Sequence, residues 1–282
     1  MIVFKKTADI IAFLNEKRTT NTVISFVPTM GALHEGHASL VRAAAQKPYL
    51  CVCSIFVNPT QFNDSSDFEK YPVTLAEDVA MLEDAGCDVL FLPSVEEIYP
   101  AGAAQMKSYE FGYLETVLEG AHRPGHFKGV GQVVGRLLDI VEPDRLYLGQ
   151  KDFQQCKVLK KLLQLTGRND RTELIVAPTI READGLAMSS RNRRLTEPQR
   201  MLAGLLYQCL VSIQTKQSSG SFPIVQKECL DLLNAKGFEP EYVSLADADT
   251  LELLADYDRS KTMVALIAAK IGDVRLIDNL VL

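Results

Sequence analysis

Short apolar runs alternate with helix-like segments through the first two thirds of the chain. The runs are 23–27, 49–57, 88–93, 145–148 and 173–176. The run that begins at Tyr49 is apolar almost throughout, as expected for a strand covered on both faces. Such alternation is typical of a parallel sheet whose crossover helices pack against it. The sequence therefore predicts an α/β fold.

Helix signals stand between these runs. Thr7 is placed to cap a first helix, and Thr74 begins a capping-box pattern whose helix is closed by Gly86. Asp152 is placed to cap another helix. We expect helices at 38–45, 128–141 and 153–165.

The pattern of apolar and polar residues changes after about residue 180, where a stretch rich in Arg, Ser, Asp and Asn shows little apolar periodicity. Two helix-like segments, 197–216 and 222–236, are followed by strand candidates at 242–245, 263–271 and 275–280. We predict a Rossmann-like, doubly wound parallel sheet at 1–183, which binds the substrates. A smaller C-terminal α+β domain is expected at 184–282.

Composition excludes several classes of protein. Hydrophobic residues make up 47% and charged residues 23% of the 282 residues, as in ordinary globular proteins. A net charge of −6 argues against a general nucleic-acid binder, and no apolar run approaches the ~20 residues that span a bilayer. The six cysteines lack metal-ligand spacing, and Cys51 and Cys53 are expected to be a buried pair. We expect a cytoplasmic, reduced protein without membrane or nucleic-acid partners.

The stretch from Val27 to His37 joins a strand, a glycine-bearing turn and a helix start. Exposed backbone N–H groups and the helix dipole both favour an anion at such a place. His34 and His37, three residues apart, add hydrogen-bond donors that can follow developing negative charge. The alternative is that both histidines merely cap or line the first turn of a surface helix, and spacing alone leaves the two readings open.

Four polar clusters lie where predicted strands end: 29–37, 58–61, 149–155 and 179–191. Each cluster alone is explained by the usual polarity of loops. Ligands of open α/β sheets, however, bind outside the carboxyl ends of the strands, where all four clusters fall. Their convergence predicts a binding site at that edge.

The residue types in these clusters suit a phosphate-containing substrate. Lys151 can neutralise phosphate, and Ser189, Ser190 and Arg191 can bind further phosphate oxygens. Gln61 and Gln155 suit a substrate with hydroxyl and carboxylate groups. No Ser–His–Asp or Cys–His pattern stands out, so the chemistry is expected to consist of aligning substrates and stabilising phosphoryl charge.

Magnesium is expected in such a site, although few carboxylates present themselves. Glu77 and Asp78 are the candidate ligands. The alternative for both is an ordinary solvated first turn of a helix.

Long motifs of this chain resemble the pantoate–β-alanine ligase (pantothenate synthetase) family. They are 28–37 (PTMGALHEGH), 56–62 (FVNPTQF), 151–155 (KDFQQ) and 181–192 (READGLAMSSRN), and the likeness continues to 274–279 (VRLIDN). The resemblance implies that ATP and pantoate form pantoyl adenylate and pyrophosphate, and that the β-alanine amine then displaces AMP. It also implies a homodimer and a C-terminal domain that acts as a lid.

The resemblance also implies roles for individual residues. His37 would be the proton donor. His34 and Lys151 are expected as further catalytic groups because they can supply cationic donors to the phosphates. Residues expected to contact ATP are Met30, Gly31, Ala32, Leu33, His34, Glu35, Gly36, His37, Gly149, Gln150, Lys151, Asp152, Ile180, Met188, Ser189, Ser190 and Arg191. Substrate contacts are expected from Gln61, Gln155, Asn58, Tyr71, Arg123 and His126. Gln150 departs from the family, which commonly has Glu at that place.

Two alternatives remain from the sequence. Other nucleotidyltransferases, such as aminoacyl-tRNA synthetases and cytidylyltransferases, share the His-x-Gly-His element. A synthetase would need a basic surface for tRNA and usually a longer chain. A non-catalytic nucleotide-binding module could use the same loops as a sensor.

Overall fold

The computed structural model describes residues 1–62 and 68–282 of the chain. It contains two compact units, Met1–Gly149 with Gln155–Ala177, and Gln150–Gln154 with Pro178–Leu282. The second unit thus includes a short segment, 150–154, that the predicted boundary at residue 183 assigns to the first domain. Hydrogen bonds from Asn279 to the carbonyls of Gln150 and Lys151 hold this segment to the second unit.

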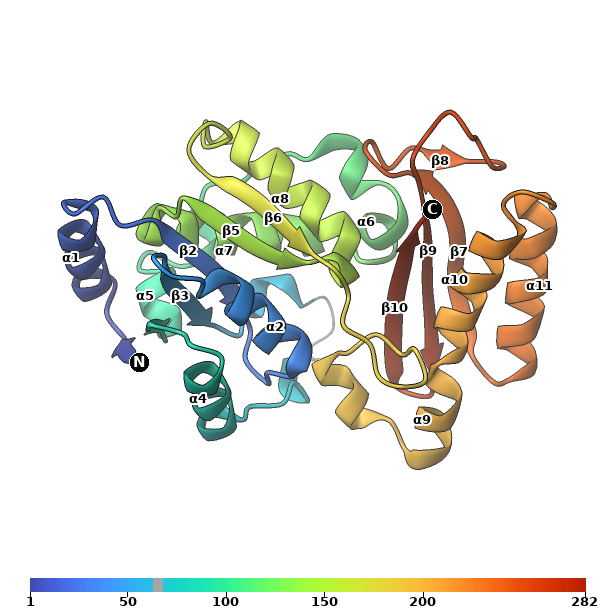
Figure 1. Cartoon of the computed structure of the whole chain (residues 1–282), viewed down its shortest axis with the longest axis horizontal. Coiled ribbons are helices and arrows are strands. Elements are labelled where there is room, and N and C mark those ends of the chain that lie inside the picture. The colour runs from blue at the N-terminus through green and yellow to red at the C-terminus, as the bar shows by residue number, and fades with distance from the viewer. Residues whose placement is uncertain (63–67) are drawn as a thin grey trace. The chain divides into compact units, whose positions relative to one another are not determined.

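The first unit is built on a six-stranded parallel sheet in the order β1-β4-β3-β2-β5-β6 (Figure 1). The strands are β1 (Ile2–Phe4), β2 (Ile24–Thr29), β3 (Leu50–Ile55), β4 (Val89–Phe91), β5 (Arg145–Gly149) and β6 (Glu173–Ala177). From β2 the chain proceeds outward to β3 and β4, whereas from β5 it proceeds the other way to β6. The direction reverses between β2 and β5, so the predicted doubly wound sheet is confirmed.

Helices cover both faces of this sheet. They are α1 (Thr7–Arg18), α2 (Glu35–Ala44), α4 (Leu75–Asp84), α5 (Val95–Ile98), α6 (Leu118–His122), α7 (His126–Val141) and α8 (Phe153–Leu165), with 3₁₀ turns η1 (Pro59–Gln61), η2 (Ala103–Gln105) and η3 (Gly112–Glu115). Phe26 points into a core shared with α1, α7 and α8, and Val27 into a core shared with α2 and α4. Successive residues of β2 are buried on opposite faces, which explains its almost continuous apolar sequence.

The second unit is an α+β unit around an antiparallel sheet in the order β10-β9-β7-β8. Its elements are η4 (Gln150–Asp152), η5 (Ser190–Arg194), α9 (Glu197–Ala203), α10 (Leu205–Lys216), α11 (Phe222–Ala235), β7 (Glu239–Asp247), β8 (Leu253–Leu254), β9 (Met263–Ile271) and β10 (Val274–Val281). Apolar side chains of α10 and α11 form its core with those of β7 and β9. In the described part of the chain, no helix combines the length and hydropathy needed to cross a bilayer.

Several boundaries differ from those predicted. The expected helix at 197–216 is two helices, α9 and α10, which meet at Gly204. A Cβ at Gly204 would lie 2.8 Å from the backbone oxygen of Asp184, so the chain passes too close for a side chain there. Helix α2 begins earlier than predicted, at Glu35, with His34 as its N-cap. Strands β1 and β8 were not predicted, because three and two residues are too few to show a pattern.

The two predicted threonine caps have different outcomes, because Thr74 is the N-cap residue of α4 and Thr7 is not the N-cap residue of α1. Thr7 is the first residue of α1 rather than its cap, and its backbone N–H donates to Glu97 Oε2 at 2.8 Å. Thr74 does precede α4, but its hydroxyl donates to Asp78 and makes no cap hydrogen bond. At the start of α1, the distant carboxylate of Glu97 therefore supplies the acceptor that the local sequence pattern assigns to Thr7.

The cap of α1 makes stability depend on pH. Hydrogen bonds from the Thr7 backbone N–H and the Lys6 ammonium lower the pKa of Glu97 from 4.5 to about 2. A carboxyl with a lowered pKa stabilises the fold above its ordinary pKa, and this contribution is lost as the pH falls through the lowered value. Glu97→Gln should therefore lower the thermal unfolding temperature at pH 6, and the difference from the parent should shrink toward pH 2. The exposed Glu16→Gln on α1 is the control, and a pH-independent deficit would contradict the role of Glu97.

Candidate functional site

The turn after β2 has an unusual backbone conformation. Gly31 has φ 79° and Ala32 has φ 48°, so two successive residues are left-handed. Glycine adopts this conformation readily, but for alanine it is unfavourable and needs outside support. The hydroxyl of Thr29 accepts from Gly31 N at 3.2 Å, which begins the turn directly at the end of β2.

Asp78, on α4, supplies that support. Its Oδ2 accepts from Ala32 N at 2.9 Å, and its Oδ1 accepts from Leu33 N at 2.7 Å and from Thr74 Oγ1 at 3.0 Å. The side chain is only 2% exposed, so these hydrogen bonds form away from competing water. Asp78 therefore fixes the turn that leads into the two histidines.

The two histidines stand at the start of α2. His34 is the N-cap in extended conformation, and His37 lies in the first turn. Their ring centroids are 4.1 Å apart, and His34 N donates to His37 Nδ1 at 3.3 Å. Because Nδ1 accepts this bond, the proton of a neutral His37 ring lies on Nε2, which becomes a donor. The two histidines therefore shape the start of α2, and the role of His37 as a donor to phosphate stays a prediction.

A second group of polar residues surrounds η1, after β3. Asn58 is only 1% exposed, and its Oδ1 accepts from the Tyr99 hydroxyl at 2.6 Å. Its Nδ2 donates to Gly129 O at 3.3 Å and to Gln61 Oε1 at 3.2 Å. Burial raises the pKa of Tyr99, so its hydroxyl stays a donor. Asn58 thus acts on the position of Gln61, whose Nε2 lies 3.1 Å from Met30 Sδ.

Helix α7 approaches η1 closely enough to require glycine. A Cβ at Gly129 would lie 2.5 Å from Thr60 O, a distance that only a backbone shift could relieve. His126, buried at the start of α7, holds the same turn through a contact of 2.9 Å between its Nδ1 and Gln61 O. Arg123 Nη1 lies 3.1 Å from His126 Nε2 and can only donate, so the ring proton is on Nδ1 and points at Gln61 O.

Two further residues of the first unit, Tyr71 and Gln155, are predicted to contact the substrates. Tyr71 is buried, with its ring centroid 5.7 Å from that of Phe62. Gln155 is half-buried near the start of α8. By contrast, the predicted residues Met30, Asn58 and His126 each contact Gln61 directly, and Arg123 contacts His126.

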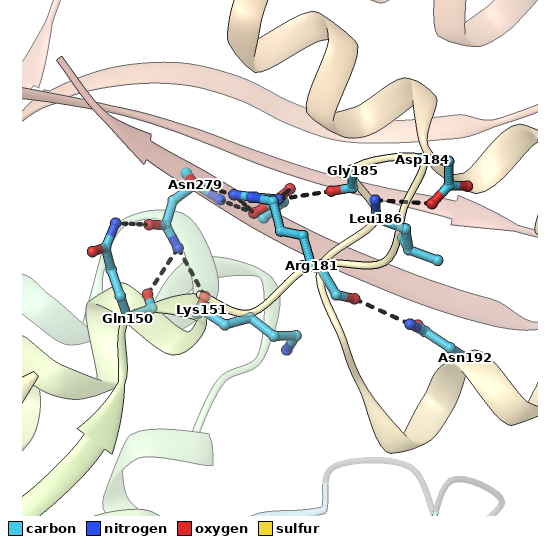
Figure 2. A network of polar contacts seen from close by, with 10 residues as sticks. Gln150, Lys151, Arg181, Asp184, Gly185, Leu186, Asn192 and Asn279 are labelled. Carbon is cyan, nitrogen blue, oxygen red and sulfur yellow. Dashed lines mark hydrogen bonds and ion pairs between the residues drawn. The ribbon is translucent and has the colours of Figure 1, made fainter. Parts of the chain in front are cut away.

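In the second unit, the turn η4 carries Lys151. Its ammonium lies 3.5 Å from Asp152 Oδ1, and its side chain is 20% exposed. Asn279 of β10 donates through Nδ2 to Gln150 O and to Lys151 O, at 2.9 Å each (Figure 2). Gln150 Nε2 donates to Asn279 Oδ1 at 3.3 Å, so the amide at this position has a defined partner.

The segment 178–191 is tied to the same strand. Arg181 donates to Asp278 through Nη1 at 2.6 Å and Nη2 at 3.0 Å, and its guanidinium lies 4.0 Å from the ring centroid of Tyr207. Burial raises the pKa of Asp278, and Arg181 opposes that rise. Met188 N donates to Ile180 O at 3.0 Å, which pairs two of the residues expected to contact ATP.

The serines expected to bind phosphate follow this pairing. Ser189 Oγ accepts from Arg191 N at 3.3 Å and so caps η5, while Ser190 is buried. An accepting hydroxyl still has its own proton to donate. Ser189 can therefore fix η5 and remain a donor toward an anion.

The two predicted metal ligands do not form a metal site: Glu77 is exposed in the first turn of α4, and Asp78 is buried and already engaged. Both Asp78 oxygens already accept hydrogen bonds inside the fold. Within residues 1–62 and 68–282, no group of three or more His, Cys, Asp or Glu side chains could hold a metal ion. Cys51 and Cys53 are free and buried, as expected for a buried pair.

Sequence reasoning missed the residues that act on others. Asp78 was predicted only as a metal ligand, and Tyr99, Arg181 and Asp278 received no role. One signal was present in β10, where Asp278 falls on the side of the buried Val274 and Leu276. A charged residue at an expected core position indicates a specific buried partner.

The support of the turn by Asp78 can be tested by substitution. Asp78→Ala leaves the N–H groups of Ala32 and Leu33 without their acceptor, at a cost of about 1–3 kcal/mol for each. We expect urea unfolding to show this loss and equilibrium dialysis to show weaker ATP binding. Asp84→Ala, an exposed change on α4, is the control. Unchanged stability together with a shifted Mg²⁺ dependence would show instead that Asp78 is a metal ligand.

Comparison with known proteins identifies the family of the chain. The family model described as pantoate–β-alanine ligase matches residues 2–281. A pantothenate synthetase of Cytophaga hutchinsonii is 46% identical over 272 residues, 95% of each chain. One of Bacteroides thetaiotaomicron is 43% identical over 99% of this chain and 98% of its own.

Solved structures are similar over the whole chain. A pantothenate synthetase of Thermus thermophilus matches with a TM-score of 0.91 at 39% identity and covers 99% of both chains. A Francisella tularensis pantoate–β-alanine ligase, whose structure is a complex with β,γ-ATP and β-alanine, matches at 0.84 and 36% identity, over 100% of this chain and 97% of its own. The match of the family model over nearly the full length, together with these relatives, shows that the chain belongs to the pantoate–β-alanine ligase family.

Proposed function

We propose that the chain joins pantoate to β-alanine in two steps, and that the turns described above bind the phosphates of ATP. In the first, the pantoate carboxylate attacks the α-phosphorus of ATP, pyrophosphate leaves and pantoyl adenylate forms. In the second, the β-alanine amine attacks the acyl carbon and loses a proton, and AMP leaves. The products are pantothenate, AMP and pyrophosphate.

The activity itself, ATP-dependent pantoate–β-alanine ligation, follows from family membership. The observation that carries the proposed mechanism is the turn between β2 and α2. It presents a helix start, a left-handed backbone and two histidines at the carboxyl edge of the sheet. Such an arrangement favours phosphate.

The substrates supply the nucleophiles in both steps, so the protein contributes position and charge. We assign His37 as a donor through Nε2, because its Nδ1 accepts from His34 N. His34, at the N-cap, is assigned beside it. Together with the helix dipole, these donors stabilise negative charge that develops on phosphoryl oxygens.

ATP contacts are assigned to 30–37 of the first unit and to 149–152, Ile180 and 188–191, as the resemblance implies. Lys151 and Arg191 supply positive charge, and Ser189 and Ser190 supply hydroxyl groups. Pantoate and β-alanine are assigned to Gln61, with Gln155 for pantoate. Asn58, Arg123 and His126 are assigned to hold Gln61, as their contacts support. Tyr71 remains a proposed pocket residue.

Magnesium is proposed only as the counter-ion that ATP brings with it. Mg²⁺ commonly keeps several waters and binds substrate phosphates, so it does not need a cage of protein carboxylates. A homodimer, a C-terminal domain that acts as a lid and a cytoplasmic location also remain proposals.

Isotope exchange between pyrophosphate and ATP tests the first step. Reversible formation of pantoyl adenylate should give exchange that requires pantoate and does not require β-alanine. Exchange that depends on an amino acid would indicate the synthetase alternative. No exchange with any acid would contradict adenylation and favour a non-catalytic nucleotide-binding module.

The role of His37 predicts a separate effect on the rate. His37→Ala should lower single-turnover formation of pantoyl adenylate by roughly two or more orders of magnitude, because a positioned proton donor contributes about that much. The fold should survive, as judged by circular dichroism. His122→Ala, an exposed histidine of α6, is the matched control. A nearly normal rate for His37→Ala would refute its catalytic role.

A further inference from the structure

One buried side chain of the second unit holds the turn that carries Lys151. Asn279 is 1% exposed, and both of its Nδ2 hydrogens go to carbonyls of η4, those of Gln150 and Lys151. Its Oδ1 faces Gln150 Nε2. The amide therefore uses its donors and its acceptor on a turn distant in sequence (Figure 2).

The geometry fixes which way this amide points. Two carbonyl oxygens can be satisfied only by the NH₂ end of Asn279, so its oxygen must face Gln150. The Gln150 side chain donates to this oxygen through Nε2, whereas an ionised Glu at position 150 could only accept hydrogen bonds. Gln150, where the family commonly has Glu, therefore completes the contact in this chain.

Asp278, the residue before Asn279 in β10, fixes the same stretch of strand through hydrogen bonds to Arg181. Asp278 accepts two hydrogen bonds from Arg181 and a third, at 2.7 Å, from Asn279 N. Arg181 Nη2 donates to Asn279 O at 3.2 Å, and its Nη1 to Gly185 O at 3.0 Å. Bidentate pairing with a buried carboxylate has a narrow geometry, so the Asp278–Asn279 backbone has little freedom.

We propose that Asn279 is a positioning residue for Lys151, with the Asp278–Arg181 pair as its support. Asn279 touches no reacting atom. Its two donors set the backbone of η4, and through that backbone the direction of the Lys151 side chain. This inference rests on the proposed role of Lys151 at the phosphates of ATP.

The proposal predicts a loss of rate that depends on Lys151. Asn279→Ala removes both donors and should lower single-turnover formation of pantoyl adenylate roughly 10- to 100-fold, since a displacement of about 1 Å can cost that much. Asn279→Ser keeps one hydroxyl donor and should fall between the parent and the alanine variant. Glu241→Gln is the control, because it alters an ion pair with Arg275 on the same strand without touching η4.

A double-mutant cycle separates positioning from general stability. In the Lys151→Ala background, Asn279→Ala should cause no further loss of rate, because the group that it positions is gone. Losses that multiply, or a folded Asn279→Ala protein with the rate of the parent, would overturn the proposal. If the alanine variant does not fold, the serine variant decides by the same cycle. A parental rate for Lys151→Ala alone would instead overturn the role of Lys151 on which the proposal rests.

Discussion

The pairing of β2 with β5 is the constraint on which the first unit depends. Helix α2 follows β2 and packs on one face of the sheet. Helix α8 follows β5 and packs on the opposite face. Crossovers that leave two adjacent parallel strands in opposite directions cannot cover the carboxyl ends of those strands. The turn after β2 stands at this edge, so the sheet order places it where ligands of open α/β sheets bind.

Buried polar side chains then decide what shape that edge has. In the first unit, Asp78 holds the left-handed turn at Ala32, and Asn58 and His126 hold Gln61. Within the second unit, Asn279 holds the turn of Lys151. Each works where water does not compete, so its hydrogen bonds are strong and the loss of one partner is costly. Such a scheme suits a reaction in which substrates attack one another, because donors fixed in advance need no reorganisation when charge develops.

The sequence predicted what local chemistry determines. Apolar runs identified the principal strands, Gly86 closed α4 in a left-handed conformation, and the helix at 153–165 has the predicted bounds. The predictions of helix boundaries and residue roles failed where a residue far along the chain determines the local structure. Glu97 satisfies the start of α1, Asp184 lies against Gly204, and Asp78 joins backbone groups more than 40 residues away. Local patterns carry no information about such contacts. The polar clusters, in contrast, could be located from the sequence because each directly follows an apolar run that predicts a strand.

The fate of the pantoate oxygens tests the central claim, that the pantoate carboxylate attacks the α-phosphorus of ATP, most directly. Pantoate labelled with ¹⁸O in its carboxylate is converted with unlabelled ATP and β-alanine, and the products are examined by mass spectrometry. Attack on the α-phosphorus leaves one labelled oxygen in AMP, one in the amide carbonyl of pantothenate and none in pyrophosphate. Label in pyrophosphate or inorganic phosphate, or unlabelled AMP, would contradict an adenylate intermediate.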